Sequence, residues 1–226
     1  MDIKILEQTS EFKFTCYSDC KKCCEKSTVE LSPHDIILLC KQTNLITTEL
    51  HKKYTEFIFH PQKGIPICVL KTDPLCRFHD GQKCTVYEDR PFDCRLYPLD
   101  VEFSKEGKAS YFRRKDICPS KEKKDWTIDL WLKTQNIEIG QKNRFKWLRL
   151  FNNFNNPNRD DWFNRMFVLF CYDFDQPIIQ SYCTLVDKEV PNDTEEKTAF
   201  IFQMIEDLFI RGMIEKVINL GGYVVS

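Results

Sequence analysis

Four cysteines within nine residues constrain this chain more than any other feature of its sequence. The segment CYSDCKKCC, residues 16–24, contains Cys16, Cys20, Cys23 and Cys24 out of twelve cysteines in 226 residues. Neither a disulfide framework nor a hydrophobic core needs thiols at this density. The first three are close enough in sequence for one helical turn or tight loop to bring their sulfurs together. Cys24 directly follows Cys23 with a diverging side chain, so it suits a second site or a bridge between two metals.

We expect a soluble, cytoplasmic protein of bacterial type, in which these thiols stay reduced. Residues 1–14 lack the apolar stretch and the cleavage site of a signal peptide, and the longest apolar runs are too short to span a bilayer. In the cytoplasm, clustered cysteines more often bind metals or carry out redox chemistry than form disulfides. The net charge of −1 offers no bulk attraction for nucleic acid or for an anionic membrane, so neither is expected as a partner.

The twelve cysteines divide into a set of eight and a set of four. The eight fall in three groups: Cys16, Cys20, Cys23 and Cys24; Cys76, Cys84 and Cys94; and Cys118. The four with apolar neighbours, which suit small core side chains, are Cys40, Cys68, Cys171 and Cys183. A thiolate is a soft anionic ligand, and four thiolates close a tetrahedral zinc site or hold an iron–sulfur cluster. The set of eight therefore predicts two four-ligand sites, or one site with spare cysteines.

The overall pattern predicts an α+β chain in which a cysteine-rich, metal-binding portion with short strands packs on a mostly helical C-terminal half. The first portion covers residues 1–119 and the helical portion covers residues 120–226. No linker rich in proline, serine or glycine separates them. We therefore expect one compact unit instead of two independent domains.

Local signals place several elements within these portions. Ser32, Pro33 and Asp35 have the spacing of a helix start, and the pairs Asp160-Asp161 and Glu195-Glu196 are interpreted as caps of later helices. The remaining expected elements are a helix near residues 49–58, a strand at 65–71, a turn at Asp80-Gly81, a hairpin at 101–114 around Gly107, and helices near 125–136, 141–154, 161–174 and 194–209.

The cysteine groups and the residues between them resemble the YkgJ-like cysteine-cluster family. The matching features are CxxxCxxCC at residues 16–24, Ser32-Pro33, Cys76, Gly81, CTVYEDRPFDCRLYP at 84–98, and Cys118-Pro119. Proteins of this family are described as chelators of zinc or iron, and a flagellin lysine N-methylase carries a similar cysteine domain. The resemblance, which covers about half the chain, implies that all eight cysteines of the larger set are metal ligands. It also includes Arg90, Pro91, Arg95, Tyr97 and Pro98, without assigning them a role.

Basic residues close to the cysteines can be interpreted in two ways. They are Lys21, Lys22, Arg90 and Arg95. In the first interpretation they offset the negative charge of a thiolate centre or donate hydrogen bonds to its sulfurs. In the second, Arg90 and Pro91 only shape a turn, and Arg90 pairs with Glu88 or Asp89.

The identity of the metal stays open between iron and zinc. Zinc ribbons usually combine short two-cysteine knuckles with glycine turns, and no glycine lies between Cys16 and Cys24. Cys118 followed by Pro119 is similar to ferredoxin-type ligation. These features favour iron or an iron–sulfur cluster over zinc, by a small margin.

We expect a metal-binding protein that stores, delivers or senses zinc or iron, or that uses the centre structurally. The alternative is an enzyme that modifies protein side chains, such as a lysine N-methylase that uses S-adenosylmethionine with a [4Fe-4S] cluster. Cys16, Cys20 and Cys23 have the spacing of radical S-adenosylmethionine enzymes. However, Lys22 stands where those enzymes usually have an aromatic residue, and the helical second half does not predict their barrel. Whether the protein is an enzyme stays open, and no catalytic residue is assigned.

Aromatic residues recur at helical spacing in the second portion. They are Trp126, Trp131, Phe145, Trp147, Phe151 and Phe154. Stripes of this kind are expected in a core. A groove for a protein partner is the alternative, because interfaces are also rich in aromatic side chains.

Overall fold

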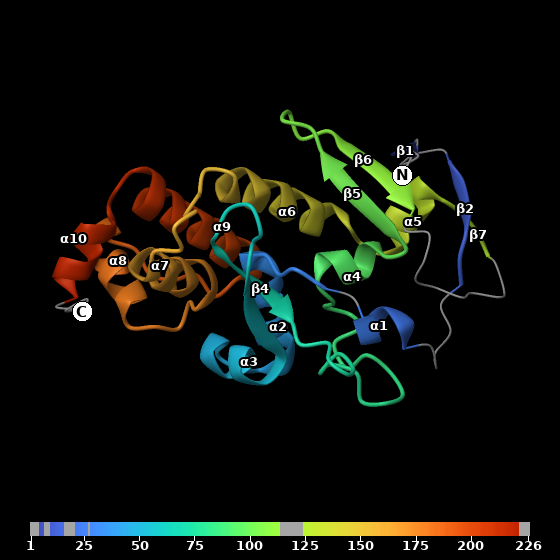
Figure 1. Ribbon diagram of the computed structural model, residues 1–226, viewed down its shortest axis with the longest axis horizontal. Coiled ribbons are helices and arrows are strands. Elements are labelled where there is room, and N and C mark those ends of the chain that lie inside the picture. The colour runs from blue at the N-terminus through green and yellow to red at the C-terminus, as the bar shows by residue number, and fades with distance from the viewer. Residues whose placement is uncertain (1–4, 7–9, 16–20, 27, 114–123, 222–226) are drawn as a thin grey trace.

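The computed structural model describes residues 5–6, 10–15, 21–26, 28–113 and 124–221 (Figure 1). These residues form an α+β fold, about 48% helical with small antiparallel strand pairs, so the predicted fold class is confirmed. The described strands are β1 (Ile5–Leu6), β2 (Glu11–Lys13), β3 (Thr55–Phe59), β4 (Pro66–Leu70), β5 (Leu99–Phe103), β6 (Ala109–Arg113) and β7 (Asp125–Thr127). The described helices are α1 (Lys22–Lys26), α2 (Pro33–Thr43), α3 (Thr47–Tyr54), α4 (Phe92–Leu96), α5 (Ile128–Thr134), α6 (Glu138–Phe151), α7 (Asp161–Tyr172), α8 (Ile178–Val186), α9 (Thr194–Ile205) and α10 (Ile214–Leu220). A π-helical segment, η1 (Glu206–Ile210), continues α9.

The strands of the described stretches pair in small antiparallel sheets. The first has the order β1-β6-β5, β2 pairs with β7, and β3 pairs with β4. The predicted hairpin corresponds to β5 and β6 and turns at Gly107, whose φ is 89°. A Cβ added there would lie 2.7 Å from the ring of Phe145. Glycine is therefore favoured both by the backbone conformation and by the lack of space.

The helix expected after Ser32 forms as predicted. Ser32 caps α2, and Pro33 occupies its first turn. The Asp35 N–H donates to Ser32 Oγ at 3.3 Å, and the Ser32 N–H donates to the Asp35 carboxylate at 2.8 Å. This reciprocal pair is a capping box, which satisfies backbone donors that the helix start would leave open.

The acidic residues at two later helix starts act partly as predicted. Asp160 caps α7 by accepting a hydrogen bond from the Phe163 N–H at 2.8 Å. At α9 the capping side chain is Asp193, which accepts from the N–H groups of Glu195 and Glu196. The two glutamates occupy the first turn, where negative charge is favourable, but they are not the cap.

The helix predicted near residues 49–58 is wrong in its second half. α3 ends at Tyr54, and residues 55–59 form β3. The segment TEFIF is rich in β-branched and aromatic residues and pairs with β4 along its whole length, with Phe57 opposite Cys68. Cross-strand pairing therefore overrides the helical pattern here. β4 confirms the strand predicted at 65–71, whereas α8 and α10 form where the sequence analysis made no prediction.

One large hydrophobic core joins the two portions of the chain. Its buried residues come from positions 29–86 and from positions 147–218. Phe167 is fully buried within it, with the ring centroids of Trp147 and Phe154 at 6.3 and 5.2 Å. Figure 1 shows α2 and β4 beside the helices of the second portion, and α2 contacts α6, α7 and α9. The predicted aromatic stripe therefore contributes to this core.

A second, smaller core also draws on both portions. Phe12 and Phe14 make edge-to-face contacts with Trp131 of α5, at centroid distances of 6.0 and 5.5 Å. The indole N–H of Trp131 donates to the Leu96 carbonyl at 3.1 Å. Both cores therefore contain residues from each side of position 119.

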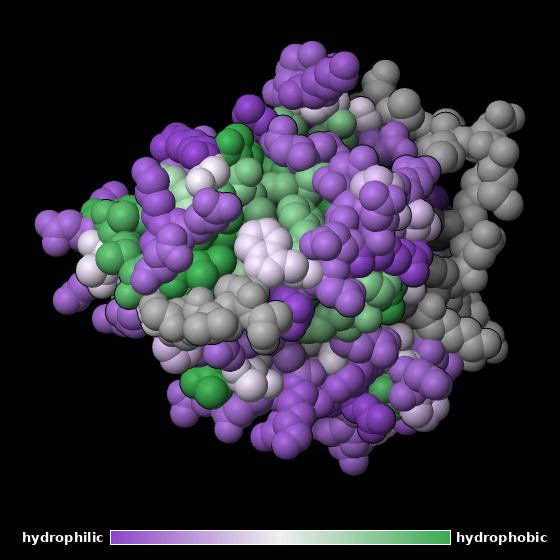
Figure 2. Space-filling view, turned by 60° about the vertical axis from the view of Figure 1, so that its left-hand side comes forward, coloured by the Kyte–Doolittle hydropathy of each residue, from purple (hydrophilic) through white to green (hydrophobic). Residues whose placement is uncertain are grey.

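The surface of the helical end is mixed in character. Figure 2 shows hydrophobic residues gathered in one region of this face, with hydrophilic residues around them. Exposed large apolar side chains of the C-terminal helical portion include Trp162, Ile210 and Leu220. In the parts of the chain that the structure describes, the helices are too short or too polar to cross a membrane.

We propose that residues 1–119 and 120–226 fold as one unit, because both hydrophobic cores cross the boundary. Limited proteolysis of the native protein is expected to release no stable fragment that ends near residue 120. If the chain is cut there, the two pieces should co-elute in gel filtration until denaturant is added. A separated fragment that keeps a cooperative thermal transition would contradict the proposal.

Candidate metal centre

Five of the eight candidate ligands belong to the described part of the chain. They are Cys23, Cys24, Cys76, Cys84 and Cys94. The other three candidates, Cys16, Cys20 and Cys118, lie outside the described residues. The geometry of the candidate centre is therefore built from the five.

The first two described thiols come from the short helix α1. The Sγ atoms of Cys23 and Cys24 are 4.0 Å apart, and both side chains are partly buried. The Cys24 N–H donates to the Lys21 carbonyl at 2.8 Å, and the Cys24 carbonyl accepts from the Cys76 N–H at 2.8 Å. This second bond joins the first cysteine group directly to the second. Figure 1 shows α1 beside the loop that follows β4.

A tight turn positions Cys76 and Cys84. As the sequence predicts, the chain reverses around Gly81, whose φ is 101°. The Asp80 carboxylate accepts hydrogen bonds from the N–H groups of Gln82 and Lys83, both at 2.8 Å. An isolated antiparallel bridge between residues 79 and 84 closes the turn. The local sequence thus folds this segment so that both thiols return to the same region.

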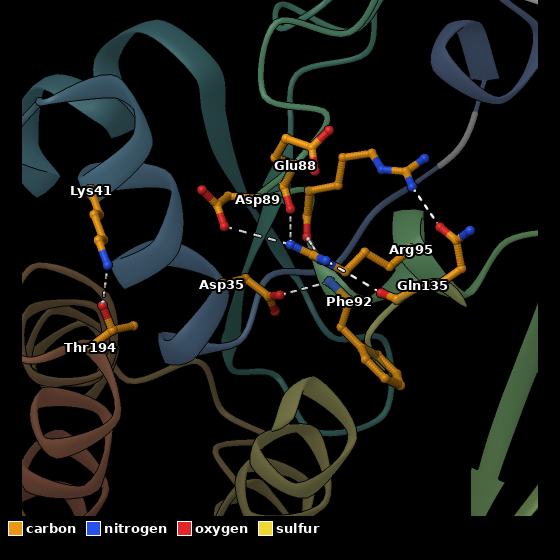
Figure 3. A network of polar contacts seen from close by, with 9 residues as sticks. Asp35, Lys41, Glu88, Asp89, Phe92, Arg95, Gln135 and Thr194 are labelled. Carbon is orange, nitrogen blue, oxygen red and sulfur yellow. Dashed lines mark hydrogen bonds and ion pairs between the residues drawn. The ribbon is translucent and has the colours of Figure 1, made fainter. Parts of the chain in front are cut away.

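Cys94 is positioned by α4, which is held in place by residues far away in the sequence. The Phe92 N–H at the start of α4 donates to the buried Asp35 carboxylate of α2 at 2.8 Å (Figure 3). Arg144 of α6 lies 3.6 Å from the carboxylate of Asp93 and 3.5 Å from that of Glu30. α4 is therefore fixed from two directions. Sequence analysis assigned Asp35 only to a helix start, and no local signal pointed to Arg144.

The pKa values of the described thiols show that they share one electrostatic environment. Burial raises the pKa of Cys94 well above its usual value, and the charges of Asp93 and Cys76 raise it further. Burial also raises the pKa of Cys76 and of Cys84, with additional contributions from Cys84 on Cys76 and from Cys23 on both. Because each thiol responds to the charge of another, their sulfurs lie within electrostatic reach of one another.

The adjacent pair behaves as a coupled unit. A hydrogen bond with the Cys24 thiol lowers the pKa of Cys23 to about 7, and the same bond raises the pKa of Cys24 far above its usual value. One thiolate is thus stabilised at the expense of its neighbour. A bound cation would remove this competition, since it favours the deprotonated form of every thiol that it contacts.

The donor chemistry fits a thiophilic metal, although the five thiols do not enclose one. No three Cys, His, Asp or Glu side chains among the described residues are grouped closely enough to hold a metal ion. The five thiols come from three separate segments and lie in one neighbourhood. They mark the region of a centre, and a complete coordination sphere would need ligands from outside the described stretches or a rearrangement of these.

Arg95 supports the loop that precedes α4. Its Nε donates to the Arg90 carbonyl at 3.0 Å, and its Nη1 donates to the Gln135 carbonyl at 3.3 Å (Figure 3). Its Nη2 contacts the Glu88 carbonyl and lies 3.6 Å from the Asp89 carboxylate. The turn-shaping interpretation therefore applies to Arg95, with Asp89 as its ionic partner.

Arg90 faces the thiols instead. Burial raises the pKa values of Cys84 and Cys94, and the charge of Arg90 opposes that rise. The same charge adds to the lowering of the Cys23 pKa, which is mainly due to the hydrogen bond with Cys24. The Arg90 guanidinium stacks 3.8 Å from the Tyr87 ring centroid, and its Nη2 donates to Gln135 Oε1 at 2.8 Å. Its Nε is buried and has no hydrogen-bond partner among the described residues. Arg90 is thus the basic residue best suited to a thiolate centre; the side chain of Lys22 lies outside the described ones.

The four cysteines that sequence analysis excluded are buried in the large core or pack against it, and Cys76, Cys84 and Cys94 pack against the same core. Cys68, Cys171 and Cys183 are buried in the large core, and Cys40 is half-buried against it. Burial raises the pKa of each thiol, to about 12 for Cys40 and Cys68. Thiols of this kind are poor nucleophiles and act as small apolar side chains.

Comparison with known proteins identifies the family. The model of the CxxCxxCC family, described as "Putative zinc- or iron-chelating domain", matches residues 15–135. This match spans more than half of the chain, so the protein belongs to the CxxCxxCC family and the predicted relation to a cysteine-cluster family is confirmed. The description supports chelation of zinc or iron without choosing between them. No curated protein and no solved structure matches the chain.

The contact between Asp35 and α4 generates a mutational prediction. Asp35→Ala removes the capping box of α2 and leaves the Phe92 N–H buried without an acceptor, so it should lower the free energy of unfolding by about 2–4 kcal/mol. It should also weaken metal binding, because α4 carries Cys94. Asp193→Ala is the matched control: it removes an exposed helix cap and should cost only about 1 kcal/mol without changing metal content. Urea denaturation and elemental analysis measure both effects, and equal metal content in the two variants would contradict the positioning role.

Proposed function

We propose that this chain is a metal-binding protein that holds zinc or iron through clustered cysteine thiolates. The proposed ligands are Cys16, Cys20, Cys23, Cys24, Cys76, Cys84, Cys94 and Cys118. The observation that supports the proposal is that three separate segments meet: the Cys76 N–H donates a hydrogen bond to the Cys24 carbonyl. In addition, the charges of neighbouring candidate thiols raise the pKa values of Cys24, Cys76, Cys84 and Cys94. Thiols that are brought together and partly buried are costly to ionise unless a cation or hydrogen-bond donors compensate.

The charge and the hydrogen-bond donors of Arg90 also suit the proposed centre. Arg90 brings a positive charge and a buried Nε without a partner among the described residues. A guanidinium next to a thiolate-bound metal offsets its negative charge and donates hydrogen bonds to sulfur. Iron, alone or in an iron–sulfur cluster, is the metal that the ligand spacing favours, and zinc is its competitor.

Partial exposure of the thiols supports exchange of the metal with a donor or an acceptor. Cys23, Cys24, Cys76 and Cys84 are neither fully buried nor fully exposed. A purely structural zinc site is normally closed by its ligands and shielded. We therefore favour storage, delivery or sensing of the metal over a structural role.

The comparisons give no support to a side-chain methylase. Calorimetric titration with S-adenosylmethionine separates the two functions. Binding at micromolar levels would favour the enzyme, whereas a flat titration of the metal-loaded protein favours metal handling alone.

The ligand assignment predicts different effects for inner and outer cysteines. Replacing Cys76 and Cys94 by serine should remove most of the bound metal and lower solubility, because metal binding can contribute folding free energy on the order of 10 kcal/mol. Cys171→Ala and Cys183→Ala should keep the metal and lose only about 1–2 kcal/mol of packing. Elemental analysis of anaerobically purified variants gives the metal content. Folded wild-type protein without metal and with all thiols free would refute the proposed function.

Optical spectra of the same samples identify the metal. We expect iron with sulfur-to-iron charge-transfer absorption, which would make the protein brown. A colourless protein with stoichiometric zinc would retain the ligand set and overturn the preference for iron. Added chelator should bleach the first species and release zinc from the second.

The role of Arg90 can be tested without relying on activity. Arg90→Met should preserve stacking area over Tyr87 but remove the charge and the donors, and should weaken metal affinity about tenfold or more. Arg90→Lys should restore part of the affinity through its charge. Arg149→Met is the control, because Arg149 also lies over an aromatic ring, that of Phe145 at 6.0 Å, but away from the thiols. Competition with a chromophoric chelator measures affinity, and equal affinities in the Arg90 and Arg149 variants would exclude the role.

A further inference from the structure

β3 is an edge strand in the described part of the structure. On one side it pairs with β4 from residue 55 to residue 59. The opposite side of β4 is already occupied, because the Leu31 N–H donates to the Cys68 carbonyl at 2.8 Å and the Leu70 N–H donates to the Val29 carbonyl at 3.0 Å. Within the described stretches no strand pairs with the outer edge of β3.

The ladder shows which backbone groups face this open edge. In an antiparallel pair, successive residues direct their N–H and C=O groups alternately to opposite sides. Because Cys68 and Leu70 bond towards residues 29–31, the alternate β4 residues bond to β3 through Glu56 and Ile58. The backbone groups of Phe57 and Phe59 therefore point outwards. The side chains of Phe57, Ile58 and Phe59 are also 37%, 40% and 44% exposed, which is high for three consecutive large apolar residues.

A groove of about 630 Å³ lies between β3 and α7. Its strand wall is formed by the three apolar residues of β3 and by Pro66 of β4. Its helix wall includes Asn164, Arg165, Val168 and Leu169. The helical residues follow one another at a spacing of three to four and so form a stripe along α7. Five residues of extended chain span about 17 Å and a twelve-residue helix spans about 18 Å, so an extended segment matches the length of both walls.

Asn164 lines this groove with a largely buried side chain. The residue is 7% exposed, and its Oδ1 accepts from Asn156 Nδ2 at 2.9 Å. Its Nδ2 is buried and makes no hydrogen bond with any described residue. A buried donor without an acceptor costs about 1–3 kcal/mol. This donor is enclosed by the protein and does not reach an occupant of the groove.

The charges that line the groove indicate the chemistry of the occupant. Asp161, Asp173 and the nearby exposed Glu56 of β3 contribute three carboxylates. Two guanidinium groups oppose them, that of Arg165 and that of Arg159, which lies 4.7 Å from the centroid of the Phe59 ring. An occupant with a lysine or arginine next to its apolar residues complements this balance. Apolar side chains alternating along the occupant would contact β3 and α7.

A second copy of this chain fits less well. Two β3 strands paired antiparallel would place the residues before one strand beside the residues after the other. Lys52 and Lys53 precede β3, and His60 and Lys63 follow it. Such a dimer would bring these basic residues together at both ends of the strand pair, where like charges repel.

We propose that the groove between β3 and α7 binds an extended, basic and apolar segment of a partner protein, which adds a strand to the outer edge of β3. Main-chain hydrogen bonds to Phe57 and Phe59 provide the affinity, as in other cases of strand addition, and the α7 wall selects the side chains. This proposal does not depend on the metal centre.

The test uses the full-length protein and a phage-displayed library of random octapeptides. Enriched peptides should alternate apolar residues and contain lysine or arginine. A representative synthetic peptide should slow amide exchange at residues 55–60. Asp161→Lys should weaken its binding at least fivefold, and replacing the basic residue of the peptide by glutamate should restore binding to this variant. Glu196→Lys, a charge reversal in the first turn of α9, is the matched control and should leave affinity unchanged.

Other outcomes overturn the proposal. The first is a library selection that enriches no peptide above a blank surface. The second is peptide binding that Asp161→Lys does not weaken and that leaves amide exchange at residues 55–60 unchanged. The third is peptide binding that appears only after residues 222–226 are deleted, which would make that segment the occupant. Concentration-dependent dimers that protect residues 55–60 would assign the edge to a second copy. Val168→Lys is a second groove variant and should reduce binding as Asp161→Lys does. Circular dichroism confirms that each variant is folded.

Discussion

The buried carboxylate of Asp35 is the contact on which the arrangement of the candidate centre depends. One of its oxygens completes the capping box of α2, and the other accepts from the first N–H of α4. The two helices are thus connected by one side chain that is 1% exposed. Because a buried carboxylate is tolerated only when its lone pairs are used, the contact fixes both helix starts together. Cys94 on α4 is thereby positioned relative to the large core.

Three arginines make further contacts that connect the segments near the cysteines. Arg95 fastens the loop before α4 to α5 through the Gln135 carbonyl, and Arg144 reaches Asp93 from α6. Arg90 is held by Gln135 and keeps its charge near the thiols. Gln135 and Arg144 thus contact residues that surround Cys94, and both hydrophobic cores likewise contain residues from each side of position 119.

The sequence predicted those parts of the fold that depend on interactions between neighbouring residues. The start of α2, the turn at Gly81 and the hairpin at Gly107 depend on capping, on positive φ and on alternation, all of which are visible in short windows. The end of α3 was misplaced, because residues 55–59 become a strand only when β4 is beside them. The cap of α9 was assigned to Glu195 and Glu196, two residues after the actual cap, Asp193. All three residues are acidic, so charge alone did not distinguish the cap from the first turn.

The class of chemistry can be read from the amino-acid sequence, which has clustered thiols at chelating spacing and matches the CxxCxxCC family. The full ligand set of eight stays a prediction, which rests on the resemblance to the cysteine-cluster family together with that spacing. Tertiary structure alone decided which basic residue faces the thiols, because Arg90 and Arg95 have the same charge and similar places in the sequence. Their roles separate only when Gln135, Asp89 and Tyr87 are brought around them. The open edge of β3 likewise arises from strand order, a property of the assembled sheet that no local window contains.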